Sequence, residues 1–292
     1  MLCPTLKDVK TTLPRSLGRF ALRVLRGVAV AYCLVLLLLL WLENSLLYPA
    51  PVYPAGDWEA AYLAHEDVYF NSADGTKLHG WYVAHPEPRA VVLYAHGNGE
   101  HVAYLGPYLK EMRDERQVSI FAFDYRGYGR SEGSPEEQGI LADGHAAQQW
   151  LAKRSGLAPD ELVLMGRSLG GGVAVDLAAK NGARGLVLQN TFTSVPDAAA
   201  YLYPWAPVRW LMKNRYDSLG KIKDYSGPLL ISHGTADTLV PIALSRRLYE
   251  AAPGRKEFYV IEGGDHNALE PPEYAVALDR FLDSLPPLQP GN

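Results

Sequence analysis

Short apolar runs separated by segments of helix length constrain the fold of this chain most. Six such runs are Ala90–Ala95, Val118–Phe123, Leu162–Met165, Gly185–Leu188, Leu229–Ser232 and Phe258–Ile261. Several are apolar at successive positions, which is typical of strands buried on both faces of a parallel sheet. Helix-length segments lie between most of them, at about residues 102–116, 136–155, 169–181, 242–252 and 272–285. The alternation predicts an α/β fold with a mostly parallel, doubly wound sheet.

Two segments depart from this alternation. Glu66–Asn71 and Lys77–Ala84 predict a β-hairpin, because an Asp-Gly turn joins them. Between residues 191 and 227 no strand pattern is present, and the segment is rich in Tyr, Trp and Leu. Its prolines, Pro196, Pro204 and Pro207, exclude a long helix. We therefore expect a short helical cap insertion at 191–227, over one edge of the sheet.

Composition excludes several classes of protein. The 292 residues are 48% hydrophobic and 21% charged, as in a globular protein. The net charge of −4 is unlike that of a nucleic-acid-binding protein, which usually carries a strongly basic face. The two cysteines, Cys3 and Cys33, form no C-x-x-C pair, so the sequence predicts neither a metal site nor a disulfide framework.

The segment Gly166-Arg167-Ser168-Leu169-Gly170 joins a strand-like run to a helix-length segment. A serine in the pattern G-x-S-x-G at this position predicts a sharp turn that exposes its hydroxyl at the carboxyl end of the strand. A side chain at 166 or 170 would collide with neighbouring backbone, so glycine fits both positions. A glycine-rich turn without chemistry has the same pattern, and further residues must decide between the two interpretations.

A serine nucleophile needs a general base, and the base needs an acid that orients it. His266 lies in a loop just after the last strand-like run, and Asp237 just after Leu229–Ser232. Loops that follow parallel strands share one rim of the sheet. The sequence therefore predicts a catalytic triad of Ser168, Asp237 and His266. Of the competing acids, Asp265 adjoins the base in sequence, and Asp124 is expected to tie down its own loop.

An acyl-transfer site also needs backbone N–H groups that face the developing oxyanion. We expect one from Leu169, at the start of a helix, where N–H groups lack intrahelical acceptors. The second is expected from Asn98, in the loop after Ala90–Ala95, with Gly99 as the weaker candidate. His96, in the same loop, is expected to form internal hydrogen bonds that shape it.

Two further groups of side chains are interpreted from their setting alone. The remaining histidines outside these motifs are expected at the surface or in loops: His65, His79, His85, His101 and His145. Four aromatic residues of the insertion are candidates to line an acyl pocket, or else to seal the edge of the core: Tyr201, Tyr203, Trp205 and Trp210.

The chain resembles the α/β-hydrolase superfamily over residues 66–285. The resemblance rests on the serine motif and on four others: Tyr94-Ala95-His96-Gly97-Asn98-Gly99, Asp124-Tyr125-Arg126-Gly127-Tyr128-Gly129, His233-Gly234-Thr235-Ala236-Asp237 and Gly264-Asp265-His266. It implies an α/β-hydrolase fold and a serine hydrolase that needs no cofactor. The insertion and the N-terminal segment are similar to those of membrane-anchored esterases, lysophospholipases and protein depalmitoylases. That similarity implies a carboxylic ester or thioester substrate, as a small molecule, an acyl lipid or an acyl protein.

Two other functions remain open at this point. One is a serine peptidase of the same fold. The other is a catalytically silent binding module tethered to a membrane.

Val28–Leu42 is a run of fifteen residues with no polar side chain except that of Tyr32. As a helix it spans about 22 Å, less than the roughly 30 Å of a bilayer core, but apolar residues from Phe20 onward can extend it. Trp41 and Tyr48 are residue types that favour a membrane interface. No small-residue cleavage site follows Leu42, so we expect an uncleaved anchor rather than a signal peptide or a core helix.

Charge predicts the orientation of this anchor. Six basic residues precede Val28, whereas the segment from Glu43 to Thr76 holds six acidic residues and no Lys or Arg. The positive-inside rule then leaves the N-terminus in the cytoplasm and the catalytic domain on the other side. The expected organisation is a basic segment 1–27, a transmembrane anchor 28–42, a linker 43–64, a hydrolase domain 65–286 and a tail 287–292.

Overall fold

The computed structural model describes residues 15–268 and 270–288, and it forms two compact units. The first unit, Met1–Glu43, contains the helix α1 (Arg15–Trp41), and the second unit is Asn44–Asn292. Lys7, Lys10 and most of the expected tail lie outside the described residues.

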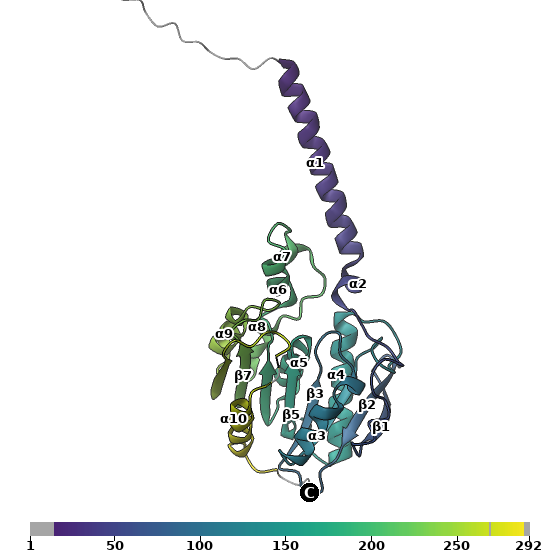
Figure 1. The fold of residues 1–292 in the computed structure, drawn as a ribbon, viewed down its shortest axis with the longest axis vertical. Coiled ribbons are helices and arrows are strands. Elements are labelled where there is room, and N and C mark those ends of the chain that lie inside the picture. The colour runs from purple at the N-terminus through teal and green to yellow at the C-terminus, as the bar shows by residue number, and fades with distance from the viewer. Residues whose placement is uncertain (1–14, 269, 289–292) are drawn as a thin grey trace, which may run out of the picture. The chain divides into compact units, whose positions relative to one another are not determined.

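An eight-stranded sheet forms the centre of the second unit (Figure 1). Its spatial order is β1-β2-β4-β3-β5-β6-β7-β8, and only the pairings of β1 with β2 and of β2 with β4 are antiparallel. The prediction of a mostly parallel, doubly wound sheet is therefore confirmed. The strands are β1 (Glu66–Asn71), β2 (Lys77–Val83), β3 (Ala90–Ala95), β4 (Val118–Asp124), β5 (Val163–Arg167), β6 (Gly185–Gln189), β7 (Leu229–Gly234) and β8 (Lys256–Ile261).

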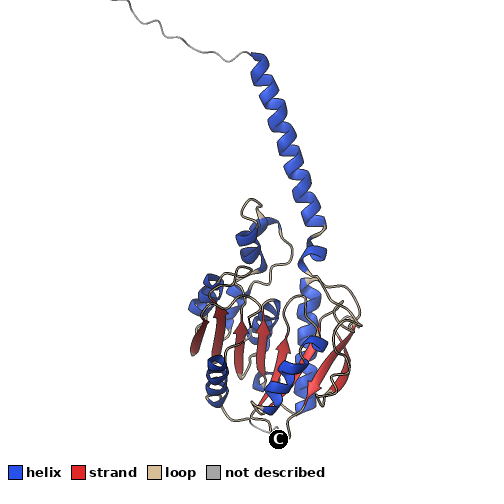
Figure 2. Ribbon diagram, in the orientation of Figure 1, coloured by secondary structure: helices blue, strands red, loops and turns tan. Residues whose placement is uncertain are grey.

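Helices cover both faces of this sheet (Figure 2). One face packs against α3 and α10, and the other packs against α4, α5 and α9. The bounds are α3 (Gly106–Asp114), α4 (Glu137–Ser155), α5 (Leu169–Asn181), α9 (Ile242–Ala251) and α10 (Pro272–Asp283).

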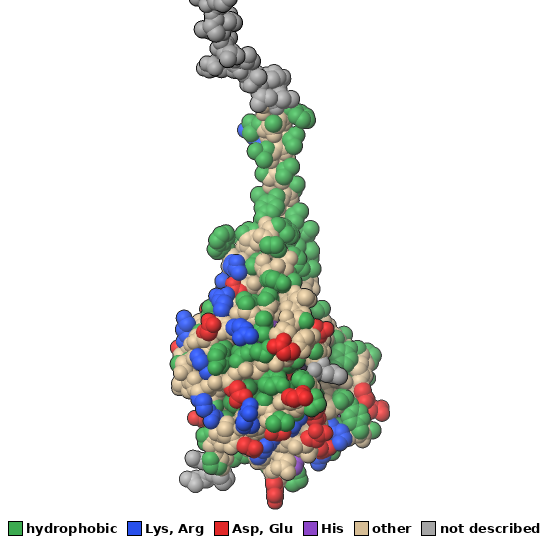
Figure 3. Space-filling model, turned by 60° about the vertical axis from the view of Figure 1, so that its left-hand side comes forward, with side chains coloured by type: hydrophobic (Ala, Val, Ile, Leu, Met, Phe, Trp, Pro, Cys, Tyr) green, Lys and Arg blue, Asp and Glu red, His purple; other side chains and the backbone are tan. Residues whose placement is uncertain are grey.

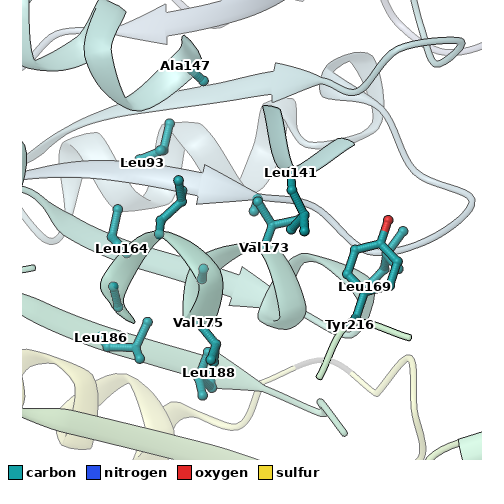
Figure 4. Packing of buried hydrophobic residues seen from close by; sticks show 14 of the residues in the cluster. Leu93, Leu141, Ala147, Leu164, Leu169, Val173, Val175, Leu186, Leu188 and Tyr216 are labelled. Atoms are coloured by element: carbon teal, nitrogen blue, oxygen red, sulfur yellow. The ribbon is translucent and has the colours of Figure 1, made fainter. Parts of the chain in front are cut away.

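The strand β3 shows why successive apolar residues are needed. Val91 and Leu93 belong to the core on the side of α4 and α5, whereas Val92 and Tyr94 belong to the core on the side of α3 and α10. Successive side chains of a strand point to opposite faces, so a sheet covered on both faces needs apolar residues at every position. Figure 4 shows the first of these cores, in which Val173 of α5 lies among side chains of the strands and of α4.

The insertion forms short helices, as its prolines require. They are α6 (Val195–Leu202), α7 (Val208–Leu211) and α8 (Ser218–Lys221), followed by the 3-10 turn η3 (Ile222–Asp224). α6 and α7 lie at the carboxyl end of the strands (Figure 1) and not over an edge of the sheet. The reason is that the insertion leaves β6, which is an inner strand.

Residues 44–64 of the expected linker 43–64 belong to the second unit and pack within it. Trp58, Ala60 and Leu63 are buried in the core beside Trp81 of β2. The indole of Trp58 also stacks on the imidazole of His101, with ring centroids 4.9 Å apart. This segment has no periodic apolar pattern, but single side chains of it are buried against elements that are distant in sequence.

The helix α1 includes a stretch of 24 residues, Gly18–Trp41, that is long and apolar enough to cross a membrane. At about 1.5 Å per residue they span about 36 Å, so the helix is longer than the run Val28–Leu42 alone. Hydrophobic side chains cover its visible face (Figure 3). A signal sequence near an N-terminus meets the same criterion, so membrane anchoring is a proposal, taken up below.

Candidate active site

The candidate site lies where the winding of the sheet changes direction. From β3 the chain passes to β4 on one side, then crosses to β5, the neighbour of β3 on the other side. The loops after β3 and β5 therefore leave the carboxyl ends of the sheet in opposite directions, and sites in such sheets usually lie between two loops of this kind. The loop after β3 carries Asn98, and β5 leads directly into Ser168.

Ser168 sits at the apex of a tight turn between β5 and α5. Its φ of 50° and ψ of −114° place a non-glycine residue in a strained conformation. A Cβ at Gly166 would lie 2.2 Å from the carbonyl oxygen of Gly170, and a Cβ at Gly170 would lie 2.0 Å from that of Ala95. Both positions thus require glycine, and the strained serine presents its hydroxyl above the sheet.

Three loops bring Ser168, His266 and Asp237 together. The Oγ of Ser168 lies 3.0 Å from Nε2 of His266, and Nδ1 of His266 lies 2.7 Å from Oδ2 of Asp237. An ionised carboxylate only accepts hydrogen bonds, so Nδ1 carries a proton and donates a hydrogen bond to Asp237. In the neutral ring, Nε2 then accepts a hydrogen bond from the serine hydroxyl.

The carboxylate of Asp237 is buried, but protein groups form hydrogen bonds to both of its oxygens. Its Oδ1 accepts the backbone N–H groups of Leu239 and Val240, at 2.9 and 2.8 Å. Burial alone would raise the pKa of Asp237. Hydrogen bonds from His233, His266 and Val240 outweigh burial and hold the pKa well below the ordinary range. Asp237 is therefore ionised at neutral pH and holds His266 in one tautomer.

Leu169 lies just after β5, and Asn98 lies just after β3. Leu169 is the first residue of α5, and the close approach of Gly170 to the end of β3 brings this helix start against the loop that carries Asn98. Within residues 15–268 and 270–288, neither backbone N–H has a hydrogen-bond acceptor. The side chain of Asn98 is bound away from its own N–H, to Tyr128 and to the carbonyl of Leu47.

Three residues that the sequence analysis does not single out hold these loops together. Arg167 binds Glu100, at 2.9 Å, and the carbonyl oxygen of His266, at 3.2 Å. Asn190, just after β6, donates to the same carbonyl and accepts the N–H of Gly234. Only the position of Arg167 beside the serine could have pointed to it, because its partners lie far away in sequence.

The competing residues have other partners. Asp124 accepts hydrogen bonds from His79 and from the N–H groups of Val102 and Arg130, so it ties loops together as expected. His79 lies between two carboxylates, those of Asp124 and Asp67, at 2.9 and 2.8 Å.

The expectation that the remaining histidines lie at the surface or in loops is wrong for His79, which is buried in β2. His101 lies in a loop, as expected, but it is also fully buried. His79 is held in the core by its two carboxylate partners, and His101 by stacking between Trp58 and Tyr104. His96 is also buried, and its Nδ1 contacts the carbonyl of Gly97, as expected for a residue that shapes its loop.

The four aromatic residues of the insertion do not seal the core. Tyr201, Tyr203, Trp205 and Trp210 are 57%, 51%, 52% and 85% exposed. These rings therefore lie at the surface of the insertion and not beneath it.

Among the described residues, no three His, Cys, Asp or Glu side chains come together as a group that could hold a metal ion.

Comparison with known proteins identifies relatives over most of the chain. A family model described as "Serine aminopeptidase, S33" matches residues 86–224. The uncharacterized protein Rv2307c of Mycobacterium tuberculosis is 36% identical over 274 residues, covering 90% of this chain and 95% of that protein. The alpha/beta hydrolase domain-containing protein WAV2 of Arabidopsis thaliana is 31% identical, covering 66% of this chain and 68% of that protein.

A solved structure has the same fold. The esterase Pf2001 of Pyrococcus furiosus superimposes with a TM-score of 0.66 at 20% identity, covering 82% of this chain and 98% of that chain. Together with the sheet order, the strained serine turn and the sequence relatives, this likeness establishes that the chain belongs to the α/β-hydrolase family.

Proposed function

We propose that the protein is a serine hydrolase that cleaves carboxylic esters or thioesters. The observation that carries this proposal is the continuous hydrogen-bonded series from Ser168 through His266 to Asp237. A serine hydroxyl is a weak nucleophile unless a base removes its proton as it attacks. Here the base lies within hydrogen-bond distance, and its second nitrogen is bound to an ionised carboxylate.

The proposed reaction passes through an acyl-enzyme. Ser168 Oγ bonds to the acyl carbon while His266 Nε2 takes the hydroxyl proton, and the acyl carbonyl oxygen becomes an oxyanion. The imidazolium then gives this proton to the leaving alcohol or thiol as the C–O or C–S bond breaks. A water molecule, activated by the same histidine, releases the carboxylic acid and restores Ser168. Asp237 stabilises the imidazolium at each stage.

We assign the oxyanion to the N–H groups of Leu169 and Asn98. Both lack an acceptor within the described residues. Leu169 directly follows Ser168, and Asn98 lies in the loop that the start of α5 approaches. Such donors stabilise the oxyanion by about 3–4 kcal/mol each in serine hydrolases.

An ester is favoured over a peptide as substrate. The solved structure reported above is that of an esterase, whereas the matching family model bears the description of an aminopeptidase. An aminopeptidase must bind the free amino group of its substrate, for which a carboxylate is the natural partner. Glu100, the carboxylate of the loop after β3, already binds Arg167 and the N–H of Gly97. This carboxylate is therefore not free to bind the amino group of a peptide substrate.

The substrate class is tested with p-nitrophenyl esters of graded length, from acetate to palmitate, beside a thioester and an aminoacyl anilide. We expect turnover of the esters and none of the anilide. Turnover of the anilide alone would show that the protein is a peptidase and not an esterase. If the protein neither turned over any of these substrates nor reacted with a fluorophosphonate, the catalytically silent binding module would be the remaining interpretation.

We also propose that α1 is an uncleaved, single-pass anchor with its N-terminus in the cytoplasm and the hydrolase unit on the opposite side. The support is the apolar stretch Gly18–Trp41 and the distribution of charge: basic residues precede Val28, and none occurs from Glu43 to Thr76.

A further inference from the structure

The helices α6 and α7 carry an exposed apolar surface, which we name the cap patch. It consists of Tyr201, Leu202, Tyr203, Trp210 and Leu211. Trp210 is the most exposed large hydrophobic side chain among the described residues, at 85%. A surface of large apolar side chains usually marks an interaction site.

Basic residues predominate around the cap patch. The segment 201–215 contains Arg209, Lys213 and Arg215 and no acidic residue, while Asp197 of α6 pairs with Arg209, at 2.8 Å. Aromatic rings beside basic side chains are typical of segments that lie in the interface of an anionic bilayer. Protein–protein interfaces are enriched in the same residue types, so the choice of a membrane depends on the connection of the cap patch to the proposed anchor.

The cap patch is also tied to the chain that leaves the proposed anchor. Asn214, three residues after Leu211, donates a hydrogen bond to Oδ1 of Asn44 and accepts one from the hydroxyl of Tyr48, both 2.8 Å long. Asn44 follows Trp41, the last residue of α1, by three residues. Three extended residues span at most about 11 Å. If α1 spans a membrane, the insertion is therefore held near the surface of that membrane.

The insertion adjoins the candidate active site as well. Thr191, at its start, donates a hydrogen bond from its hydroxyl to the carbonyl oxygen of Ser168, at 2.8 Å. A ligand of the cap patch would thus lie at the same end of the sheet as the proposed nucleophile.

We infer that the cap patch is a second membrane-contact surface, which inserts its aromatic side chains into the interface of an anionic bilayer. Interfacial segments bury their apolar face about 5–10 Å into the headgroup region. The contact brings the candidate active site to the lipid surface, so the site takes its acyl substrate from the membrane. This inference rests on the proposed anchor and deepens the proposed function by naming a lipid-borne ester as substrate.

The test uses the full chain reconstituted in vesicles of phosphatidylcholine with one third phosphatidylglycerol. Trp210→Cys or Leu202→Cys is labelled with an environment-sensitive fluorophore, in a background in which Cys3 and Cys33 are replaced by Ser. The matched control is Val276→Cys, an exposed apolar position on α10. Quenching is measured with aqueous iodide and with phospholipids brominated on their acyl chains.

We expect labels at 210 and 202 to be quenched by brominated lipid, and to be about threefold less accessible to iodide than the label at 276. Omitting phosphatidylglycerol should weaken both effects. Full iodide access at both cap positions would overturn the inference. Protection from iodide without quenching by lipid would overturn it too, because a second protein molecule would then cover the patch. The readout requires no turnover, so its failure is distinct from a failure of the proposed esterase.

Discussion

Nη1 of Arg167 lies 2.9 Å from Oε1 of Glu100, so the residue before the serine is ion-paired with the loop that follows β3. The other carboxylate oxygen of Glu100 accepts the N–H of Gly97, at 2.8 Å. Nη2 of Arg167 binds the carbonyl oxygen of His266. One ion pair therefore connects the serine turn, the loop of the proposed oxyanion donor Asn98 and the loop of the proposed base.

This pair predicts a positioning role for Arg167 and Glu100. Arg167→Met or Glu100→Gln should lower kcat about 10- to 100-fold with little change in KM, because misplacement of reacting groups by about 1 Å has effects of that size. The double variant should be no worse than the more damaged single variant, since both remove the same contact. Arg154→Met, which removes an exposed ion pair with Glu66, is the control. If all three variants lost kcat and thermal stability to the same extent, the pair would have only a structural role.

Asp237 and Asp124 should behave in opposite ways. Asp237→Asn should lower the rate about ten-thousand-fold, as loss of the correct histidine tautomer does in serine hydrolases, while the fold persists. Asp124→Asn should instead lower the free energy of unfolding by about 3 kcal/mol, because it breaks a buried pair with His79. Steady-state kinetics and denaturant unfolding of both variants check this. A folded Asp124→Asn enzyme that is slower than Asp237→Asn would mean that the acid is misassigned.

Asp176 gives the stability a predictable dependence on pH. Burial would raise the pKa of Asp176, but hydrogen bonds from His145, Lys221 and Lys180 outweigh it and lower the pKa well below its ordinary range. A carboxylate with a depressed pKa stabilises the fold fully above its unfolded pKa of about 3.9, and this stabilisation is lost as the pH falls below that value.

Asp176→Asn should therefore lower the free energy of unfolding by about 3 kcal/mol at pH 7, and the difference from the natural chain should shrink below about pH 4. Urea unfolding at a series of pH values measures both, with Glu66→Gln as an exposed control. A difference that grows as the pH falls would show that the sign of the effect is wrong.

The orientation of the membrane anchor is open to a direct test. A C-terminal tag should be digested by protease added to intact cells or spheroplasts, because the basic N-terminus stays in the cytoplasm. Protection of the tag until lysis would reverse the topology. A mature N-terminus near residue 50 would show instead that the segment is a cleaved signal.

The inner strands β3 to β7 could be predicted from the sequence because they are buried on both faces. Each strand from β3 to β8 appears as a nearly continuous apolar run, and the runs give the observed bounds to within two residues. The meeting of Ser168, Asp237 and His266 could also be predicted, because in a parallel sheet the loops that follow the strands share one rim.

Other features depend on contacts between distant residues and leave no local pattern. The burial of His79 requires carboxylates from two other segments, and the packing of residues 44–64 requires Trp58 to find Trp81 and His101. The partners of Arg167 are equally remote in sequence. The exposure of Tyr201, Tyr203 and Trp210 could not be predicted for a different reason, since large apolar side chains usually indicate burial, whereas here they are exposed in the cap patch.

The central claim, that Ser168 is the nucleophile of an ester hydrolase, is tested most directly by covalent labelling of the full chain. A fluorophosphonate should phosphonylate one residue, and peptide mass spectrometry should locate the adduct on Ser168. Ser168→Ala should retain its fold, lose the label and lose about a million-fold in ester turnover. An adduct on another residue, or near-normal turnover by pure, folded Ser168→Ala, would contradict the account.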